Sequence, residues 1–120
     1  MPSVLVVDDE ELIRWSLAQT LEAAGYEVLE AGSARETLER MSEVSDICVV
    51  LLDLKLPDSS DLTLLRTLRQ RVPRCRIILM TAHGTAEILD EALRAGAFKA
   101  LGKPFDMVRM VGIVNEAIAA

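Results

Sequence analysis

The sequence predicts an α/β domain in which five parallel strands alternate with five helices, with the helices covering both faces of one sheet. Short apolar or β-branched runs alternate along the chain with segments whose apolar residues recur at helical spacing. The connections between them are short, and right-handed crossovers of this kind give a parallel, doubly wound sheet. With 120 residues, of which 51% are hydrophobic, the chain has enough material for one such domain and too little for two.

The first strand is predicted over residues 3–7, a mostly β-branched run that stops abruptly at Asp8 and Asp9. Over residues 13–24 the apolar side chains recur on one helical stripe, which indicates the first helix. Trp15 falls about opposite this stripe at 3.6 residues per turn, so we expect it to be exposed.

The second and third strands differ in their patterns. Residues 26–30 alternate polar and apolar side chains, and Ser33 with Glu36 three residues later opens a helix that runs through about Met41. Residues 47–52 are apolar without alternation, which is typical of a strand covered on both faces. This run should be a central strand.

The rest of the chain repeats the strand and helix alternation. A helix is predicted over residues 60–71, a fourth strand over 76–80 and a further helix over 85–94. A weak fifth strand follows near residues 97–101. The last helix begins at residue 105 or 106 and continues almost to the end of the chain.

The last helix has an unusually wide apolar arc. The expected buried stripe is Met107, Val111, Val114 and Ile118, and the arc is widened by Met110, Ile113 and Ala117. One face of a sheet does not need so broad an arc. We therefore predict a homodimer contact through the fourth and fifth helices, including Leu89 and Leu93, with packing against a following domain as the alternative.

Composition excludes several classes of function. The net charge of −6 disfavours attraction to nucleic-acid phosphates. Apolar runs such as residues 47–52 are far shorter than the roughly 20 residues of a membrane-spanning helix, and the first residues lack a secretion signal. We expect a cytoplasmic protein that binds neither nucleic acid nor membrane directly. Cys48 and Cys75 are predicted to be buried, reduced thiols rather than a disulfide.

Five polar residues follow the predicted strands and should meet at one edge of the sheet. They are Asp8, Asp9, Asp53, Thr81 and Lys103. Ligands of open α/β sheets bind beyond the carboxyl ends of the strands. Three neighbouring carboxylates must take up protons or hold a cation, and hard oxygen ligands favour Mg²⁺. No phosphate-binding glycine loop is present.

Four motifs in this order resemble the receiver domain of two-component response regulators over essentially the whole chain, residues 1–120. The motifs are VVDDE at residues 6–10, LDLKLP at 52–57, MTAHG at 80–84 and KPF at 103–105. The resemblance implies a flavodoxin-like (βα)5 fold with strand order 2-1-3-4-5. It also implies a cis peptide bond before Pro104, which X-Pro bonds make accessible.

The resemblance assigns roles to the residues at the sheet edge. Asp53 is implied to be the phospho-acceptor, with Thr81 and Lys103 contacting the phosphoryl group. The implied Mg²⁺ ligands are Asp8, Asp9, Asp53 and the main-chain carbonyl of Lys55. The phosphoryl group would come from a sensor histidine kinase or a small phosphodonor, and the chain would not turn over a metabolite as an enzyme does.

Two further segments resemble one branch of this family. Residues 13–17 and 81–84 are similar to those of NtrC-like activators of sigma-54 transcription. The resemblance implies that phosphorylation regulates a transcription-activating output module absent from these 120 residues.

One position departs from the family pattern. Where members often carry an aromatic residue three positions before the lysine, this chain has Ala100, and the nearest aromatic, Phe98, is expected on the same strand face. We therefore hypothesise that signalling relies on movement of the loop after Thr81 and of the following helix.

Other interpretations remain open from the residues alone. Asp8 and Asp9 could simply cap a helix, and Asp53 with Lys103 could form a structural ion pair. A metal-dependent phosphohydrolase with Asp53 as transient nucleophile is the main alternative function, although Lys55 stands where an acid-base carboxylate is wanted. A flavin electron carrier and an inert binding module are less favoured.

Overall fold

The computed structural model describes residues 2–120, which form a five-stranded parallel sheet in the order β2-β1-β3-β4-β5. The strands are β1 (Ser3–Val7), β2 (Glu27–Ala31), β3 (Ile47–Asp53), β4 (Arg76–Thr81) and β5 (Lys99–Gly102). The helices are α1 (Glu11–Ala23), α2 (Ala34–Glu43), α3 (Thr63–Arg71), α4 (Ala86–Arg94) and α5 (Met107–Ala119). The predicted fold class and strand order are confirmed.

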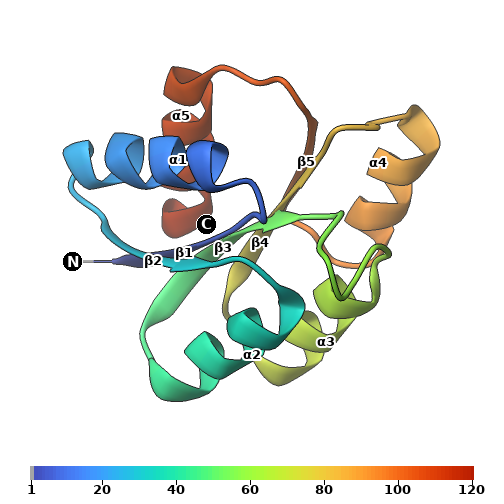
Figure 1. Cartoon of the computed structure of the whole chain (residues 1–120), viewed down its shortest axis with the longest axis horizontal. Helices are drawn as coiled ribbons and strands as arrows, with labels where there is room; N and C mark the ends of the chain where they lie inside the picture. Colours follow the sequence, from blue (N-terminus) through green and yellow to red (C-terminus); the bar gives the residue numbers. More distant parts are fainter. Residues whose placement is uncertain (1) are drawn as a thin grey trace.

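The sheet separates two apolar layers, and α1 and α5 lie on the opposite side from α2 and α3 (Figure 1). One layer packs side chains of β1, β3, β4 and β5 against α1 and α5, with Leu17 and Val114 at its centre. The other packs the opposite faces of these strands against α2, α3 and α4, with Leu65 and Ala92 buried. Because β3 contributes to both layers, it is covered on both faces, as its continuous apolar run predicts.

Several element boundaries differ from the prediction by one to three residues, and the starts of α3 and β5 have identifiable local causes. α3 begins at Thr63 rather than at residue 60, because residues 56 and 59 form a tight bridge and Asp61 Oδ1 accepts a hydrogen bond from the Thr63 amide at 2.9 Å. β5 begins at Lys99 rather than 97, because the backbone bends at Phe98, although the Phe98 amide already donates to the Ile77 carbonyl of β4 at 2.7 Å.

The prediction that both cysteines are buried is wrong for Cys48. Pairing between β1 and β3 steps from Ser3–Ile47 to Val4–Val49, which leaves Cys48 as an extra residue of an irregular strand. Its side chain is exposed, while Cys75 is buried, and both thiols are free. An irregularity of this kind cannot be predicted from a continuous apolar sequence such as residues 47–52, because it does not change the residue pattern.

The buried stripe of α5 is also rotated from the predicted one. The buried residues are Met110, Ile113, Val114 and Ala117, whereas Met107, Val111 and Ile118 are partly buried. The sequence left this orientation ambiguous because α5 is apolar around most of its circumference.

The outer side of α1 carries two large apolar side chains. Leu12 is 74% exposed and Trp15 is 57% exposed, which confirms the expectation for Trp15.

Within residues 2–120, the helices are too short or too polar to cross a lipid bilayer.

Candidate functional site at the carboxyl edge of the sheet

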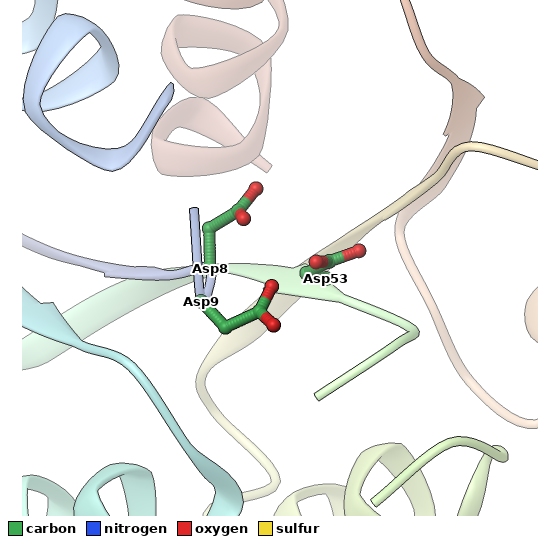
Figure 2. Close-up of side chains that lie close together, drawn as sticks. All are labelled: Asp8, Asp9 and Asp53. Carbon is green, nitrogen blue, oxygen red and sulfur yellow. The ribbon is translucent and has the colours of Figure 1, made fainter. Parts of the chain in front are cut away.

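Three carboxylates gather where β1 and β3 end. Asp8 and Asp9 directly follow β1, and Asp53 is the last residue of β3. Figure 2 shows the side chains of all three grouped at this edge, and each offers an oxygen within 4.8 Å of the other two. Asp8 and Asp53 are buried while Asp9 is exposed, so the cluster is deep on one side and open to solvent on the other.

Lys103, which follows β5, brings an ammonium group into this cluster. Its Nζ lies 2.7 Å from Asp8 Oδ2 and 3.5 Å from Asp53 Oδ2. The same ammonium lies 3.7 Å from Glu10 Oε1 at the exposed rim. The peptide bond between Lys103 and Pro104 is cis, as the resemblance implies.

The cluster keeps an excess of negative charge despite the lysine. Burial, and then the charge of Asp8, raise the pKa of Asp53 to about 6 against the opposing effect of Lys103. Burial alone would lower the pKa of Lys103, but the hydrogen bond to Asp8 and the charge of Asp53 outweigh it and hold that pKa above its ordinary value. Such a site favours a further cation.

Thr81 ends β4 at the same edge and is buried. Its register partner on β5 is Gly102, the residue before Lys103. Thr81 and Lys103 therefore lie at the ends of adjacent strands, one residue apart in register. The Thr81 hydroxyl accepts a hydrogen bond from the His83 amide at 3.1 Å. The His83 side chain is exposed, as expected of a loop residue.

The main chain of the loop after β3 turns back on Asp53. The Lys55 amide donates to Asp53 Oδ1 at 3.4 Å, and the Leu54 amide donates to the Met80 carbonyl of β4 at 2.9 Å. The residues predicted for the site are therefore assembled at one edge by segments from four strands. Glu10 is the N-cap residue of α1 and its side chain makes no cap hydrogen bond, but Asp8 Oδ1 accepts one from the Glu10 amide at 2.9 Å. Asp8 therefore also holds the main chain just before α1.

Sequence reasoning missed one residue beside the site, Arg14. Its Nη1 donates to the Asp8 carbonyl at 2.7 Å, and its Nε pairs with Glu30 Oε1 of β2 at 3.1 Å. Gly32 leaves room for it, because a Cβ there would lie 3.0 Å from Arg14 Nη1. A signal was available: a cation near the amino end of a helix opposes the helix dipole and needs anionic or carbonyl partners.

Ala100 and the nearest aromatic residue, Phe98, pack on opposite sides of the sheet. Ala100 packs with the layer on the α2, α3 and α4 side, whereas Phe98 packs with the layer on the α1 and α5 side. The expectation that they share a strand face is wrong, because Phe98 lies in the bend before β5 and strand alternation does not extend to it.

Comparison with known proteins supplies an independent line of observation. A family model described as the response regulator receiver domain matches residues 4–115. The chain is 38% identical over 117 residues to the DNA-binding transcriptional regulator NtrC of Escherichia coli (strain K12), covering 97% of this chain and 24% of that protein. It is 37% identical over 115 residues to the response regulator protein PilR of Pseudomonas aeruginosa, covering 95% of this chain and 25% of PilR.

Solved structures give the same picture. A receiver domain protein from Clostridium thermocellum superposes with a TM-score of 0.92 at 34% identity, covering 99% of this chain and 95% of that one. The beryllofluoride-activated NtrC4 receiver domain dimer superposes with a TM-score of 0.93 at 33% identity, covering 99% of this chain and 98% of that one. The chain thus spans the whole of such domains but about a quarter of the curated relatives' length.

Proposed function

Since this chain belongs to the response regulator receiver domain family, we propose that it is a phosphorylation-dependent switch in which Asp53 accepts a phosphoryl group. The whole of residues 1–120 is the domain that carries this role. The observation that supports it best is the position of Asp53: its carboxylate lies 3.5 Å from Lys103 Nζ and beside two further aspartates.

The donor set fits a hard divalent cation. Asp8, Asp9 and Asp53 offer carboxylate oxygens within 4.8 Å of one another, and such oxygens suit Mg²⁺. The main-chain carbonyl of Lys55 is the fourth protein ligand we propose. Mg²⁺ bound there neutralises negative charge on the transferring phosphoryl group and its oxygens.

In the proposed transfer, an Asp53 carboxylate oxygen forms a bond to phosphorus. The P–N bond of a phosphohistidine, or the P–O bond of acetyl phosphate, breaks and its electron pair stays with the leaving group. Lys103 then faces a phosphoryl group that carries about −1.5 to −2 charges at neutral pH, in place of the single negative charge of the Asp53 carboxylate. The Thr81 hydroxyl donates a hydrogen bond to a phosphoryl oxygen, and it can do so while its oxygen accepts the bond from the His83 amide.

The family and the relatives support a proposal about partners. We propose a sensor histidine kinase as phosphodonor and, by likeness to NtrC and PilR, regulation of a transcription-activating output module of the sigma-54 type. The net charge of −6 supports a signalling domain that does not itself hold DNA, and the site of action is the cytoplasm.

We also propose a homodimer through α4 and α5. Leu93 on α4 is 47% exposed and Leu89 is partly buried, and the solved NtrC4 receiver is a dimer in its beryllofluoride-activated form. Light scattering with and without beryllofluoride tests this. Formation of a dimer when beryllofluoride is added supports the contact, and a monomer under both conditions contradicts it.

The phosphohydrolase alternative is not favoured. Position 55, where an acid-base carboxylate is wanted, holds a lysine, and the family is one of signalling domains. Intact mass after incubation with acetyl phosphate and Mg²⁺ separates the two functions. A gain of one phosphoryl group that is lost in Asp53→Ala supports the switch, while steady release of phosphate with no lasting gain supports the hydrolase.

A further inference from the structure

Asp58, in the loop after β3, is bonded to a helix that is distant in sequence. Its Oδ1 accepts a hydrogen bond from the Ala34 amide at 2.7 Å, and its Oδ2 accepts one from the Arg35 amide at 3.0 Å. These are the first two amides of α2, more than twenty residues earlier in the chain. One carboxylate therefore joins the loop that follows Asp53 to the amino end of α2.

The contact fills a gap that α2 leaves open. Ser33 accepts from the Glu36 amide through Oγ at 3.1 Å and from the Thr37 amide through its carbonyl at 3.0 Å. The two amides before these have no partner within the helix, as in every α-helix. A carboxylate there also meets the positive end of the helix dipole. The two bonds lower the pKa of Asp58, so it is ionised at neutral pH.

The loop between Asp53 and Asp58 is thus held at both ends. At one end the Leu54 amide donates a hydrogen bond to a carbonyl of β4, and the Lys55 amide donates one to the Asp53 side chain. At the other end Asp58 bonds α2. The main chain at Lys55, where we place a metal ligand, lies between these two attachments.

We propose that Asp58 is a positioning residue that holds the loop after β3 in its cation-binding shape and couples α2 to the aspartate cluster. The inference rests on the proposed function, because it concerns the same metal site. On this proposal the amino end of α2 responds when Mg²⁺ binds to the aspartate cluster. Mg²⁺ binding by the three aspartates does not by itself require such a response.

Asp61 offers a matched control within the same loop. It is exposed, and its Oδ1 accepts from the Thr63 amide at the start of α3. Removing either carboxylate deletes one negative charge in this loop, together with two helix-end hydrogen bonds for Asp58 and one for Asp61. The difference is that Asp61 accepts its hydrogen bond from α3, the helix that follows it directly, whereas Asp58 accepts its hydrogen bonds from α2, which lies earlier in the chain.

The first test compares Mg²⁺ affinity by calorimetry for the wild-type chain, Asp58→Ala and Asp61→Ala, at a temperature where circular dichroism shows all three folded. We expect Asp58→Ala to bind Mg²⁺ about threefold to tenfold more weakly than Asp61→Ala, because an outer contact that orients ligands is lost. Equal affinities in the two variants overturn the inference.

A second variant breaks the same contact from the helix side. Ala34→Pro removes one donor amide without changing charge; proline is tolerated at the first helical position, and Ser33 has the extended backbone (φ −153°, ψ 167°) that a residue before proline needs. We expect a smaller loss of Mg²⁺ affinity, and no additional loss when Ala34→Pro is added to Asp58→Ala. Fully additive losses contradict a shared contact.

The amide resonances of Ala34 and Arg35 provide a readout that a simple helix cap would not move. They should shift on addition of Mg²⁺ in wild type and in Asp61→Ala, and the Arg35 amide should stay unchanged in Asp58→Ala. A wild-type chain that binds no Mg²⁺ overturns the proposed function and this inference together. Binding with equal responses in Asp58→Ala and Asp61→Ala overturns the inference alone.

Discussion

Lys103 Nζ lies 2.7 Å from Asp8 Oδ2, an ion pair between residues 95 positions apart in the chain. The Asp8 side chain has no exposed surface and that of Lys103 is 10% exposed. The pair is therefore shielded from water, and each charge depends on the other. Lys103 thus serves the stability of the fold as well as the chemistry we propose for it.

Removing the ammonium should leave a buried aspartate without its cation. We expect Lys103→Met to lower the free energy of unfolding at pH 7 by about 2–3 kcal/mol, measured by urea denaturation. Lys99→Met, which changes an exposed lysine of β5, is the control and should cost less than about 0.5 kcal/mol. Equal midpoints for the two variants would show that Asp8 does not depend on Lys103.

The raised pKa of Asp53 predicts a pH-dependent loss of stability. Below its ordinary pKa of 3.8 the group is protonated in both states, so it contributes nothing. As the pH rises towards the folded-state pKa of about 6, the unfolded chain releases its proton first and the free energy of unfolding falls. Without metal, Asp53→Asn should therefore be more stable than wild type by on the order of 2 kcal/mol at pH 7.5.

The same comparison at pH 3.5 should show little difference, and that convergence is the check on the cause. Asp46→Asn, an exposed aspartate, serves as control and should track wild type at both pH values. A stability gain in Asp53→Asn that is equal at pH 3.5 and pH 7.5 would assign the effect to packing instead of charge.

Mg²⁺ should stabilise the folded chain, because the acidic cluster exists only when β1 and β3 are paired. At a concentration one hundred times the dissociation constant, we expect about 2.7 kcal/mol of added stability. Asp9→Asn removes an exposed carboxylate and should shrink this gain while leaving the metal-free stability nearly unchanged. Thermal unfolding with and without Mg²⁺ measures both, and a melting temperature that Mg²⁺ does not move would contradict the site.

The loop after β4 is packed closely against the end of β5 through two glycines. A Cβ added at Gly84 would lie 2.9 Å from Gly102 Cα, so the loop must shift to accept alanine. We expect Gly84→Ala to lower the free energy of unfolding by about 1–2 kcal/mol. Gly112→Ala, in α5 with no neighbour within 4 Å, should instead raise it by about 0.5–1 kcal/mol. Denaturant unfolding that ranks the two in the reverse order refutes the packing argument.

The two thiols should differ sharply in reactivity. Burial raises the pKa of Cys75 to about 12, whereas Cys48 is exposed. In the native protein at pH 8, iodoacetamide should modify Cys48 and spare Cys75, with both modified in urea. Peptide mass mapping reads this directly, and Cys75 labelling in the native state at the rate of Cys48 would contradict the packing of β4.

The fold was largely predictable because three of the five strands end in a recognisable way. Apolar runs that stop at Asp8, Asp53 and Thr81 identify both the strands and the edge where they finish. The irregular pairing that exposes Cys48 and the bend at Phe98 were not predictable, because they depend on neighbouring strands and not on local pattern. The rotation of α5 was hidden by its wide apolar arc.

For the site, residue types at strand ends were enough to name Asp53, Lys103 and their neighbours. The contacts of Arg14 and Asp58 were not predicted. Both bridge elements that are separated in sequence, and both contact main-chain groups, the Asp8 carbonyl and the α2 amides. The position of Arg14 near the start of a helix signals that it needs a partner, but a main-chain partner cannot be identified from residue types.

The lysine that pairs with the aspartates directly follows β5, the edge strand that pairs with β4 alone. On the ribosome the three aspartates emerge about fifty or more residues ahead of it, and synthesis proceeds at roughly 5–20 residues per second. For those seconds the growing chain has its acceptor carboxylate but no ammonium beside it. The proposed acceptor site is therefore complete only once the residues that follow the final strand have been made.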